Sequence, residues 1–250
     1  MRIETNEALA RRNRKIAQYL FFATFGILLL GMIFINQQAT TITDENIAVV
    51  TLLQTAVLPI AFITTIISVR MTNLWVRQPR PEAVIAEGLK GVVHKGVLYS
   101  YYHFPARHVL VSPQGVLAIV TRFQDGNFTV EGDKWTTHKT ALSRVLSIFR
   151  FDNIGNPTND ALRAAAHVKA KLQPIAPDVE VIPVIVFTSP KAVVTMLNPT
   201  VPVILPSGKK VLSLSQGFKD LLRAEAKSET KPMALTAEQI EAFEQATLPH

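Results

Sequence analysis

Two long uncharged stretches dominate the first part of the chain. Residues 16–35 and residues 47–69 contain no Asp, Glu, Lys or Arg and are rich in Leu, Ile, Val and Phe. About twenty apolar residues in a helix, each rising 1.5 Å, cross a hydrocarbon core roughly 30 Å thick. Pro59 lies inside the second stretch, where a membrane helix tolerates proline as a kink. The pattern therefore predicts two transmembrane helices, 16–35 and 47–69.

Basic residues lie before the first stretch and after the second, and not in the loop between them. Lys and Arg occur in residues 1–15 and in the linker 70–81, whereas the connecting loop 36–46 has none and carries two acidic residues. By the positive-inside rule, both ends face the cytoplasm and the short loop faces outward. A cleaved signal peptide has a shorter apolar core that ends in small residues. We therefore expect an integral inner-membrane protein with a basic cytoplasmic N-terminus and a two-helix hairpin.

Shorter apolar patterns follow from residue 82 onward. Residues 82–93 repeat apolar side chains at helical spacing, and 179–188 form a nearly continuous apolar run, typical of a strand buried on both faces. The turn sequence at 112–115 separates β-branched runs at 108–111 and 116–121, which predicts a β-hairpin. The other expected strands are 98–104, 128–131, 134–135 and 201–205, and the other expected helices are 157–172, 218–226 and 235–248. This order predicts an α/β or α+β fold with a mixed sheet, comprising a domain at 82–214 and C-terminal helices in 215–250.

Composition narrows the classes of protein further. Hydrophobic residues make up 48% of the chain and charged residues 18%, which excludes an intrinsically disordered chain. The lack of cysteine excludes a disulfide scaffold, a thiolate metal site and a cysteine nucleophile. No phosphate-binding glycine loop, zincin helix or G-x-S-x-G elbow is present, so we expect no cofactor. The net charge of +7 predicts an anionic partner, with a lipid surface favoured over nucleic acid.

The expected β-hairpin carries a recognisable pattern. Residues 107–122 read RHVLVSPQGVLAIVTR and resemble the core of the nuclease-related domain (NERD) family, in which a strand of the type QIDHLVVGPTG runs into one of the type VFVIETK. Further agreement with the family comes from Glu82 and Val84, Asp125-Gly126, Trp135, Asn156-Pro157 and residues 184–187. The resemblance covers roughly residues 81–212 and implies a restriction-endonuclease-like fold.

The resemblance also implies a divalent-metal site for phosphodiester cleavage, and the chain departs from it. The family's Asp before His falls at Arg107, its strand Glu at Val120 and its Lys at Arg122. The Gln of its later helix falls at Asp160, and only Glu82 remains of the acidic set. Mg²⁺ requires oxygen ligands, whereas arginine is effectively always protonated and is never a ligand.

These departures favour a pseudo-nuclease, a catalytically inactive domain that serves as a binding or scaffold module at the cytoplasmic face. Arg107 and Arg122 would be neighbours across the expected hairpin. They are candidates for binding an anion, or for ordinary ion pairs with Glu82 or Asp125, which is the favoured interpretation.

Two alternatives remain open from the sequence. The first is a metal-dependent nuclease with migrated carboxylates, for which the candidates are Glu82, Glu87, Asp125 and Glu131. The second is a small accessory subunit of a larger membrane complex. In that case the small residues Ala23, Gly26 and Gly31 would allow close packing of the first membrane helix.

Overall fold

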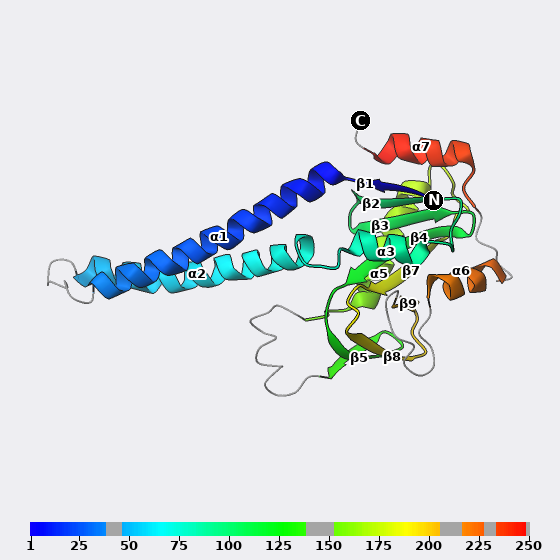
Figure 1. Ribbon diagram of the computed structural model, residues 1–250. Coiled ribbons are helices and arrows are strands. Elements are labelled where there is room, and N and C mark those ends of the chain that lie inside the picture. Colours follow the sequence, from blue (N-terminus) through cyan, green and yellow to red (C-terminus); the bar gives the residue numbers. More distant parts are fainter. Residues whose placement is uncertain (39–46, 139–152, 206–216, 228–233, 249–250) are drawn as a thin grey trace. The chain divides into compact units, whose positions relative to one another are not determined.

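The chain forms two compact units, seen in the computed structural model of Figure 1. The structure describes residues 1–38, 47–138, 153–205, 217–227 and 234–248. Residues 1–7 and the described residues from Pro79 onward make up the domain unit, and residues 8–78 make up the helical unit. The expected loop residues 39–46 and the expected boundary between 214 and 215 lie outside the described residues.

A six-stranded mixed sheet forms the centre of the domain unit, in the order β1-β2-β3-β4-β7-β9. Strands β2, β3 and β4 form an antiparallel meander, whereas β1, β7 and β9 pair in parallel with their neighbours. The predicted hairpin is confirmed, since Ser112 pairs with Gly115 at its turn. The bounds are Arg2–Thr5 (β1), Val97–His103 (β2), Ala106–Ser112 (β3), Gly115–Arg122 (β4), Val181–Phe187 (β7) and Val203–Ile204 (β9).

Helices cover both faces of this sheet. Helices α3 (Pro81–Leu89) and α6 (Phe218–Lys227) pack against one face, and α5 (Pro157–Leu172) and α7 (Ala237–Thr247) pack against the other. Successive strand residues point to opposite faces, so Leu117 joins the α3 side of the core and Ala118 joins the α5 side. The predicted mixed α/β architecture is therefore confirmed, and the C-terminal helices are part of its core.

A second, three-stranded sheet continues from the first, in the order β6-β5-β8. Its strands are β5 (Gly126–Glu131), β6 (Lys134–His138) and β8 (Ala192–Leu197). The parallel pair β4 and β7 passes directly into the parallel pair β5 and β8. Strand β8 is absent from the sequence prediction. The residues of β8 alternate only partly between buried and exposed positions, so they carry no clear strand pattern. The strand conformation of β8 therefore depends on its pairing with β5.

The chain contributes a further strand before the helical unit begins. Residues 1–15, expected to form a basic tail, instead divide between β1 and the first turns of α1. Strand β1 pairs in parallel with β2 at the edge of the main sheet. Glu244 of α7 accepts hydrogen bonds from both Arg2 and Tyr99. Four residues are too few to show an alternating pattern of apolar and polar side chains. Residues 2–5 form a strand only because they pair with the edge of β2.

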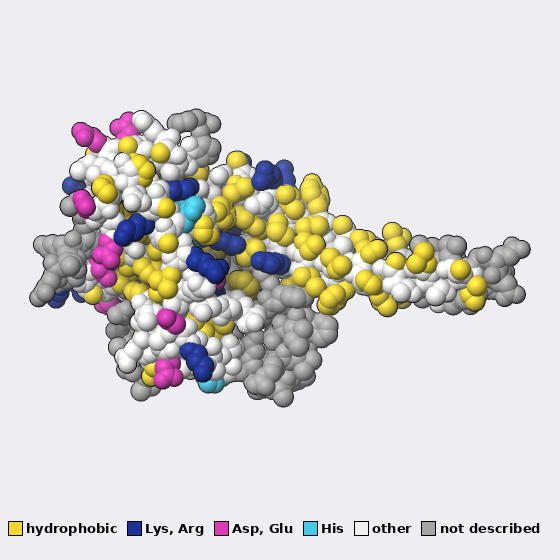
Figure 2. All heavy atoms as spheres, turned by 180° about the vertical axis from the view of Figure 1, so that it is seen from behind, with side chains coloured by type: hydrophobic (Ala, Val, Ile, Leu, Met, Phe, Trp, Pro, Cys, Tyr) yellow, Lys and Arg dark blue, Asp and Glu magenta, His cyan; other side chains and the backbone are white. Residues whose placement is uncertain are grey.

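The helical unit contains two long helices, α1 (Glu7–Gln38) and α2 (Ile47–Trp75). Within them, Glu7–Phe34 and Thr55–Trp75 are long and apolar enough to cross a membrane. Both helices extend beyond the predicted spans at the ends that join the domain unit. Large apolar side chains such as Phe22 and Leu30, each 67% exposed, lie on their surfaces, and Figure 2 shows hydrophobic side chains over the visible face of these helices.

Buried small residues recur every seven positions on both helices, a pattern that we call the seam. The buried positions of α1 are Ala10, Ala17, Thr24 and Gly31, each seven residues after the last. Ala61 and Ser68 of α2 are buried and are also seven residues apart. A repeat of seven residues is the pattern of helices that supercoil left-handedly around each other. At Gly31 the two helices approach each other closely, since a Cβ atom there would lie 2.8 Å from Cγ1 of Val57.

We expect Gly31→Val to weaken the pairing of α1 with α2, because the added carbons overlap Val57. Overpacking of this kind costs about 1–3 kcal/mol. Gly26→Val is the matched control, since a Cβ atom at Gly26 meets nothing within 4 Å. The natural chain has no cysteine, so two introduced cysteines on α1 and α2 accept spin labels cleanly. The distance distribution between the labels should broaden only for Gly31→Val, and broadening in both variants would contradict the seam.

The domain unit contains two buried histidines, His103 among aromatic rings and His108 beside the Ser100 hydroxyl. The His103 ring lies 4.8 Å from the Phe243 ring and 5.5 Å from the Tyr99 ring, and neither of its nitrogens has a hydrogen-bond partner. Burial, with a smaller contribution from Lys171, lowers the pKa of His103 to about 4. Burial, assisted by the charge of Arg107, lowers the pKa of His108 to about 3. Both rings are therefore neutral in the folded protein at neutral pH.

Acid should destabilise the domain unit through these rings. The unfolded chain binds a proton at each histidine near pH 6.5, whereas folded His103 resists protonation until about pH 4. The free energy of unfolding should fall as the pH drops from 6.5 towards 4, by about 3 kcal/mol for His103 alone. His103→Phe keeps the aromatic packing and should reduce this dependence in denaturant titrations by the contribution of His103, whereas the contribution of His108 remains. His94→Gln, at an exposed position, should leave it unchanged.

Candidate functional site

The candidate site lies where β4 ends and α5 begins. The Arg122 guanidinium, at the last residue of β4, forms an ion pair with Asp160 in the first turns of α5. Nε of Arg122 donates to the Ile154 carbonyl at 3.2 Å, and a terminal nitrogen donates to the Thr121 carbonyl at 3.1 Å. The guanidinium thus joins strand, loop and helix.

Burial determines the electrostatics of this ion pair. The Arg122 side chain is only 12% exposed, whereas that of Asp160 is 50% exposed. Burial lowers the pKa of Arg122, and the Asp160 carboxylate opposes that shift. Arginine nevertheless stays protonated in proteins. A cation that is largely removed from water is stable only with anionic and carbonyl partners, and the structure supplies both.

The start of α5 is fixed by its own capping. The Asn156 side chain accepts a hydrogen bond from the backbone N–H of Asn159 at 3.0 Å, and Pro157 occupies the first turn. These are favoured residues at a helix N-terminus. Trp135 of β6 donates to the Thr158 hydroxyl at 2.8 Å. Asp160 therefore projects from an anchored turn, where the helix dipole favours a negative charge.

The two other substituted positions lie on the same hairpin. His108 pairs with Ile119, so Arg107 and Val120 are the next residues along β3 and β4. Val120 is partly buried and packs against two core clusters, one under α5 and one that includes Phe128 and Phe187. Arg107 is half-buried. At position 120 an alkyl side chain thus fills core space where the family resemblance places a metal-binding carboxylate.

Glu82 lies at the start of α3 and accepts a hydrogen bond from the Tyr101 hydroxyl at 2.7 Å. Tyr101 lies where the β2–β3 pairing is irregular, and its φ of 69° is unusual for a residue with a side chain. The Tyr101 ring also contacts the His108 ring at 5.1 Å. Glu82, the one acidic residue left from the family pattern, is thus engaged by the β2–β3 hairpin.

The other carboxylates considered for a nuclease site each interact with a different neighbour. Glu87 forms an exposed ion pair with Lys90 at 3.8 Å, and Asp125 accepts a hydrogen bond from the Ser189 hydroxyl. Glu131 ends β5 opposite Lys134. Within the described part of the chain, no group of three or more His, Asp or Glu side chains could hold a metal ion. The donor set therefore does not fit the divalent ion that the family resemblance implies.

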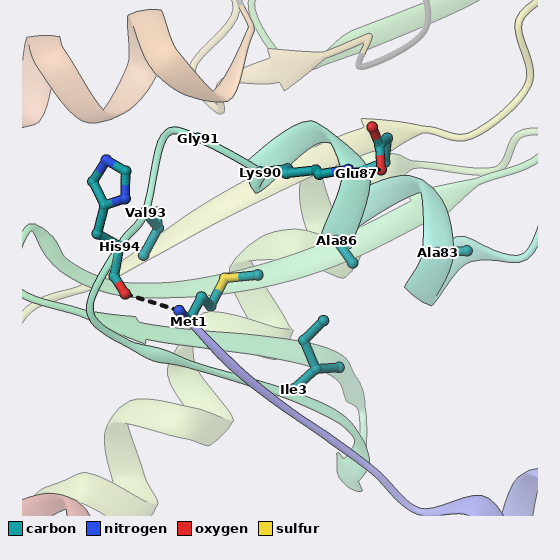
Figure 3. A pocket seen from close by; sticks show the side chains of 9 residues that line it. All are labelled: Met1, Ile3, Ala83, Ala86, Glu87, Lys90, Gly91, Val93 and His94. Carbon is teal, nitrogen blue, oxygen red and sulfur yellow. Dashed lines mark hydrogen bonds and ion pairs between the residues drawn. The ribbon is translucent and has the colours of Figure 1, made fainter.

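A pocket of about 410 Å³ lies between β1 and α3, on the opposite face of the sheet from α5. Figure 3 shows Met1, Ile3 and Ala86 along it, with the Met1 amino group donating to the His94 carbonyl at 2.8 Å. Its lining combines apolar side chains with His94, the Met1 amino group and the Glu87–Lys90 pair. It is therefore separate from the Arg122–Asp160 pair.

Comparison with known proteins confirms the predicted family over the central part of the chain. Residues 83–188 match the family model of the nuclease-related domain, NERD. No curated protein and no solved structure matches the chain. The matched segment runs from α3 through β7 and includes both Arg122 and Asp160.

The sequence identified Arg122 and Asp160 individually but did not predict that they form an ion pair. Arg122 and Asp160 stand at two positions where the chain departs from the family pattern, and 38 residues separate them. The signal that connects them is chemical, because a Lys position has become Arg and a neutral Gln position has become acidic. The Ile154 carbonyl, which completes the arrangement, has no signal in the sequence.

Removing the carboxylate should destabilise the domain unit. Asp160→Asn leaves the largely buried Arg122 without its anionic partner, and we expect a loss of about 1–3 kcal/mol in the free energy of unfolding. Arg122→Gln should lower the free energy of unfolding further, because it also removes the hydrogen bonds to the carbonyl groups of Ile154 and Thr121. The exposed Asp178→Asn is the control. Denaturant titration of the single variants and the double variant should yield a coupling energy near 1 kcal/mol, and strict additivity would contradict the pairing.

Proposed function

We propose that this chain is a membrane-anchored, nuclease-related protein whose domain binds a partner at the cytoplasmic face without cleaving phosphodiester bonds. The observation that carries the proposal is the Arg122–Asp160 ion pair at the end of β4. A nuclease of the family that it resembles needs carboxylates and a lysine in this region. Here the guanidinium groups of Arg107 and Arg122 and the isopropyl group of Val120 take their places.

The chemistry of the substituted residues supports the loss of catalysis. Hard divalent cations require several oxygen ligands, and a fixed guanidinium close by repels them. The Arg122 donors are directed at Asp160, Ile154 and Thr121. The negative charge of Asp160 is balanced by this ion pair. We further infer that the order of elements from α3 to β7 represents the restriction-endonuclease-like fold.

Chain connectivity supports the proposed anchor. Residues 1–6 precede α1, and the residues from Pro79 onward follow α2, yet both belong to the domain unit. A chain that leaves a domain, enters a bilayer and returns to the same domain must cross the bilayer an even number of times. Helices α1 and α2 supply two candidate crossings. The basic residues at their domain-side ends favour the cytoplasm.

We expect the full chain in detergent to show no cleavage of DNA or RNA that depends on Mg²⁺ or Mn²⁺. Gel assays against samples containing a chelator would measure it. Metal-dependent cleavage that disappears in Glu82→Ala, and survives in Tyr101→Phe, would contradict the proposal. Tyr101→Phe is the matched control because it removes the hydrogen bond to Glu82 and keeps the carboxylate.

Restoring the family residues should restore metal binding. The combined variant Arg107→Asp, Val120→Glu, Arg122→Lys and Asp160→Gln returns oxygen ligands to the end of the hairpin. We expect it to bind Mn²⁺ at least about tenfold more tightly than the natural chain, equivalent to about 1.4 kcal/mol, in titrations that follow free Mn²⁺ by electron paramagnetic resonance. Lys134→Asp with Thr136→Glu, on the exposed strand β6, controls for carboxylates added elsewhere.

A further inference from the structure

Helix α1 carries its basic residues on a rigid extension of the apolar segment. The helix begins at Glu7, whereas the uncharged run begins at Ile16. At 1.5 Å per residue, residues 7–15 extend about 14 Å beyond that run. Basic side chains are thus held at defined heights above the apolar segment, within the reach of lipid headgroups.

The contact of Gly31 with Val57 sets the register of the two antiparallel helices. Counting 1.5 Å per residue from this contact, Arg70 of α2 lies level with Gln18 of α1. That height is within about 5 Å of Lys15 along the axis. The two helices therefore present basic residues at one level, although 55 positions separate Lys15 and Arg70 in the sequence.

We name this group the cationic collar. Its members are Arg11, Arg12, Arg14, Lys15 and Arg70. Four of them are exposed and Arg14 is half-buried. Glu7, at the first residue of α1, is the one acidic residue in the sequences of α1 and α2, so the collar carries an excess of positive charge on this pair of helices. Tyr19, 70% exposed, and Trp75 lie near the same level, and these residue types favour the interface between lipid and water.

We propose that the cationic collar binds the headgroups of anionic phospholipids in the cytoplasmic leaflet. This inference rests on the proposed membrane anchor and adds a selectivity to it. Each Lys or Arg close to an anionic surface strengthens the attraction about fivefold, and salt screens the attraction. The collar thus recruits anionic lipids around the hairpin, whereas a purely apolar anchor would accept any lipid of suitable thickness.

Trp75 provides a local probe of the lipids around the collar. The chain has two tryptophans, so Trp135→Phe leaves Trp75 as the only one. The full chain is reconstituted in vesicles that contain equal mole fractions of phosphatidylglycerol and phosphatidylcholine, with bromine on the acyl chains of one lipid or the other. Brominated chains quench nearby tryptophan fluorescence, so the ratio of the two quenching constants reports the local lipid composition.

We expect the brominated anionic lipid to quench Trp75 at least about threefold more strongly than the zwitterionic lipid at low salt, with the ratio falling in 0.5 M salt. The ratio should approach one when the five collar residues are changed to Gln. The matched control changes five exposed basic residues of the domain unit to Gln, namely Arg163, Lys169, Lys219, Arg223 and Lys227. That control should keep the preference.

Each contrary result has a distinct meaning. Equal quenching by the two lipids, or a preference that survives in the collar variant, overturns the headgroup proposal and leaves the anchor intact. No quenching by either lipid overturns the membrane anchor itself and, with it, the collar. Collar-dependent binding of a single-stranded oligonucleotide, without lipid preference, assigns the cations to nucleic acid and also overturns the proposal.

Discussion

A guanidinium held largely out of water at the end of β4 governs the arrangement of the candidate site. Arg122 stays charged, so its surroundings must supply hydrogen-bond acceptors and a counter-charge. Asp160 provides the charge, and the carbonyl groups of Ile154 and Thr121 provide further acceptors. The same contacts tie the last residue of a central strand to the first turns of α5. An ion pair made only of protein groups thus stands in the region where the family resemblance implies a metal site.

In the surrounding fold, the residues at these substituted positions take part in strand pairing and core packing. Strands β4 and β7 run in parallel and pass into β5 and β8, and Thr188 donates its backbone N–H to the Arg122 carbonyl at 2.8 Å where this passage begins. Val120 contributes to the core beneath both sheets. A carboxylate in its place would place a charge among apolar side chains, at a cost unless a cation neutralised it. At position 120, core packing therefore takes the place of the carboxylate that the family resemblance implies.

The connectivity of the chain links the anchor to the domain in a similar way. Strand β1 belongs to the domain unit, and the helical unit is inserted between it and α3. A fragment that begins at the linker lacks the edge strand of the main sheet and the Arg2–Glu244 ion pair. The buried positions of α1 and α2 are the small residues of the seam, and their large apolar side chains face outward. The two candidate membrane helices are therefore joined directly in the chain to the edge strand and to the first helix of the domain unit.

The sequence by itself determined the elements with strong periodic or compositional signals: two long apolar helices, the hairpin at 107–122, the buried strand β7, helix α5 and the family to which residues 83–188 correspond. It also identified Arg122 and Asp160 as separate departures from that family. Only the tertiary structure decided that β1 and β8 are strands, that residues 10, 17, 24 and 31 form a seam, and that Arg122 and Asp160 pair. The physical reason is that periodicity reports the environment of each segment, whereas edge strands and ion pairs depend on partners distant in the chain, which only folding brings together.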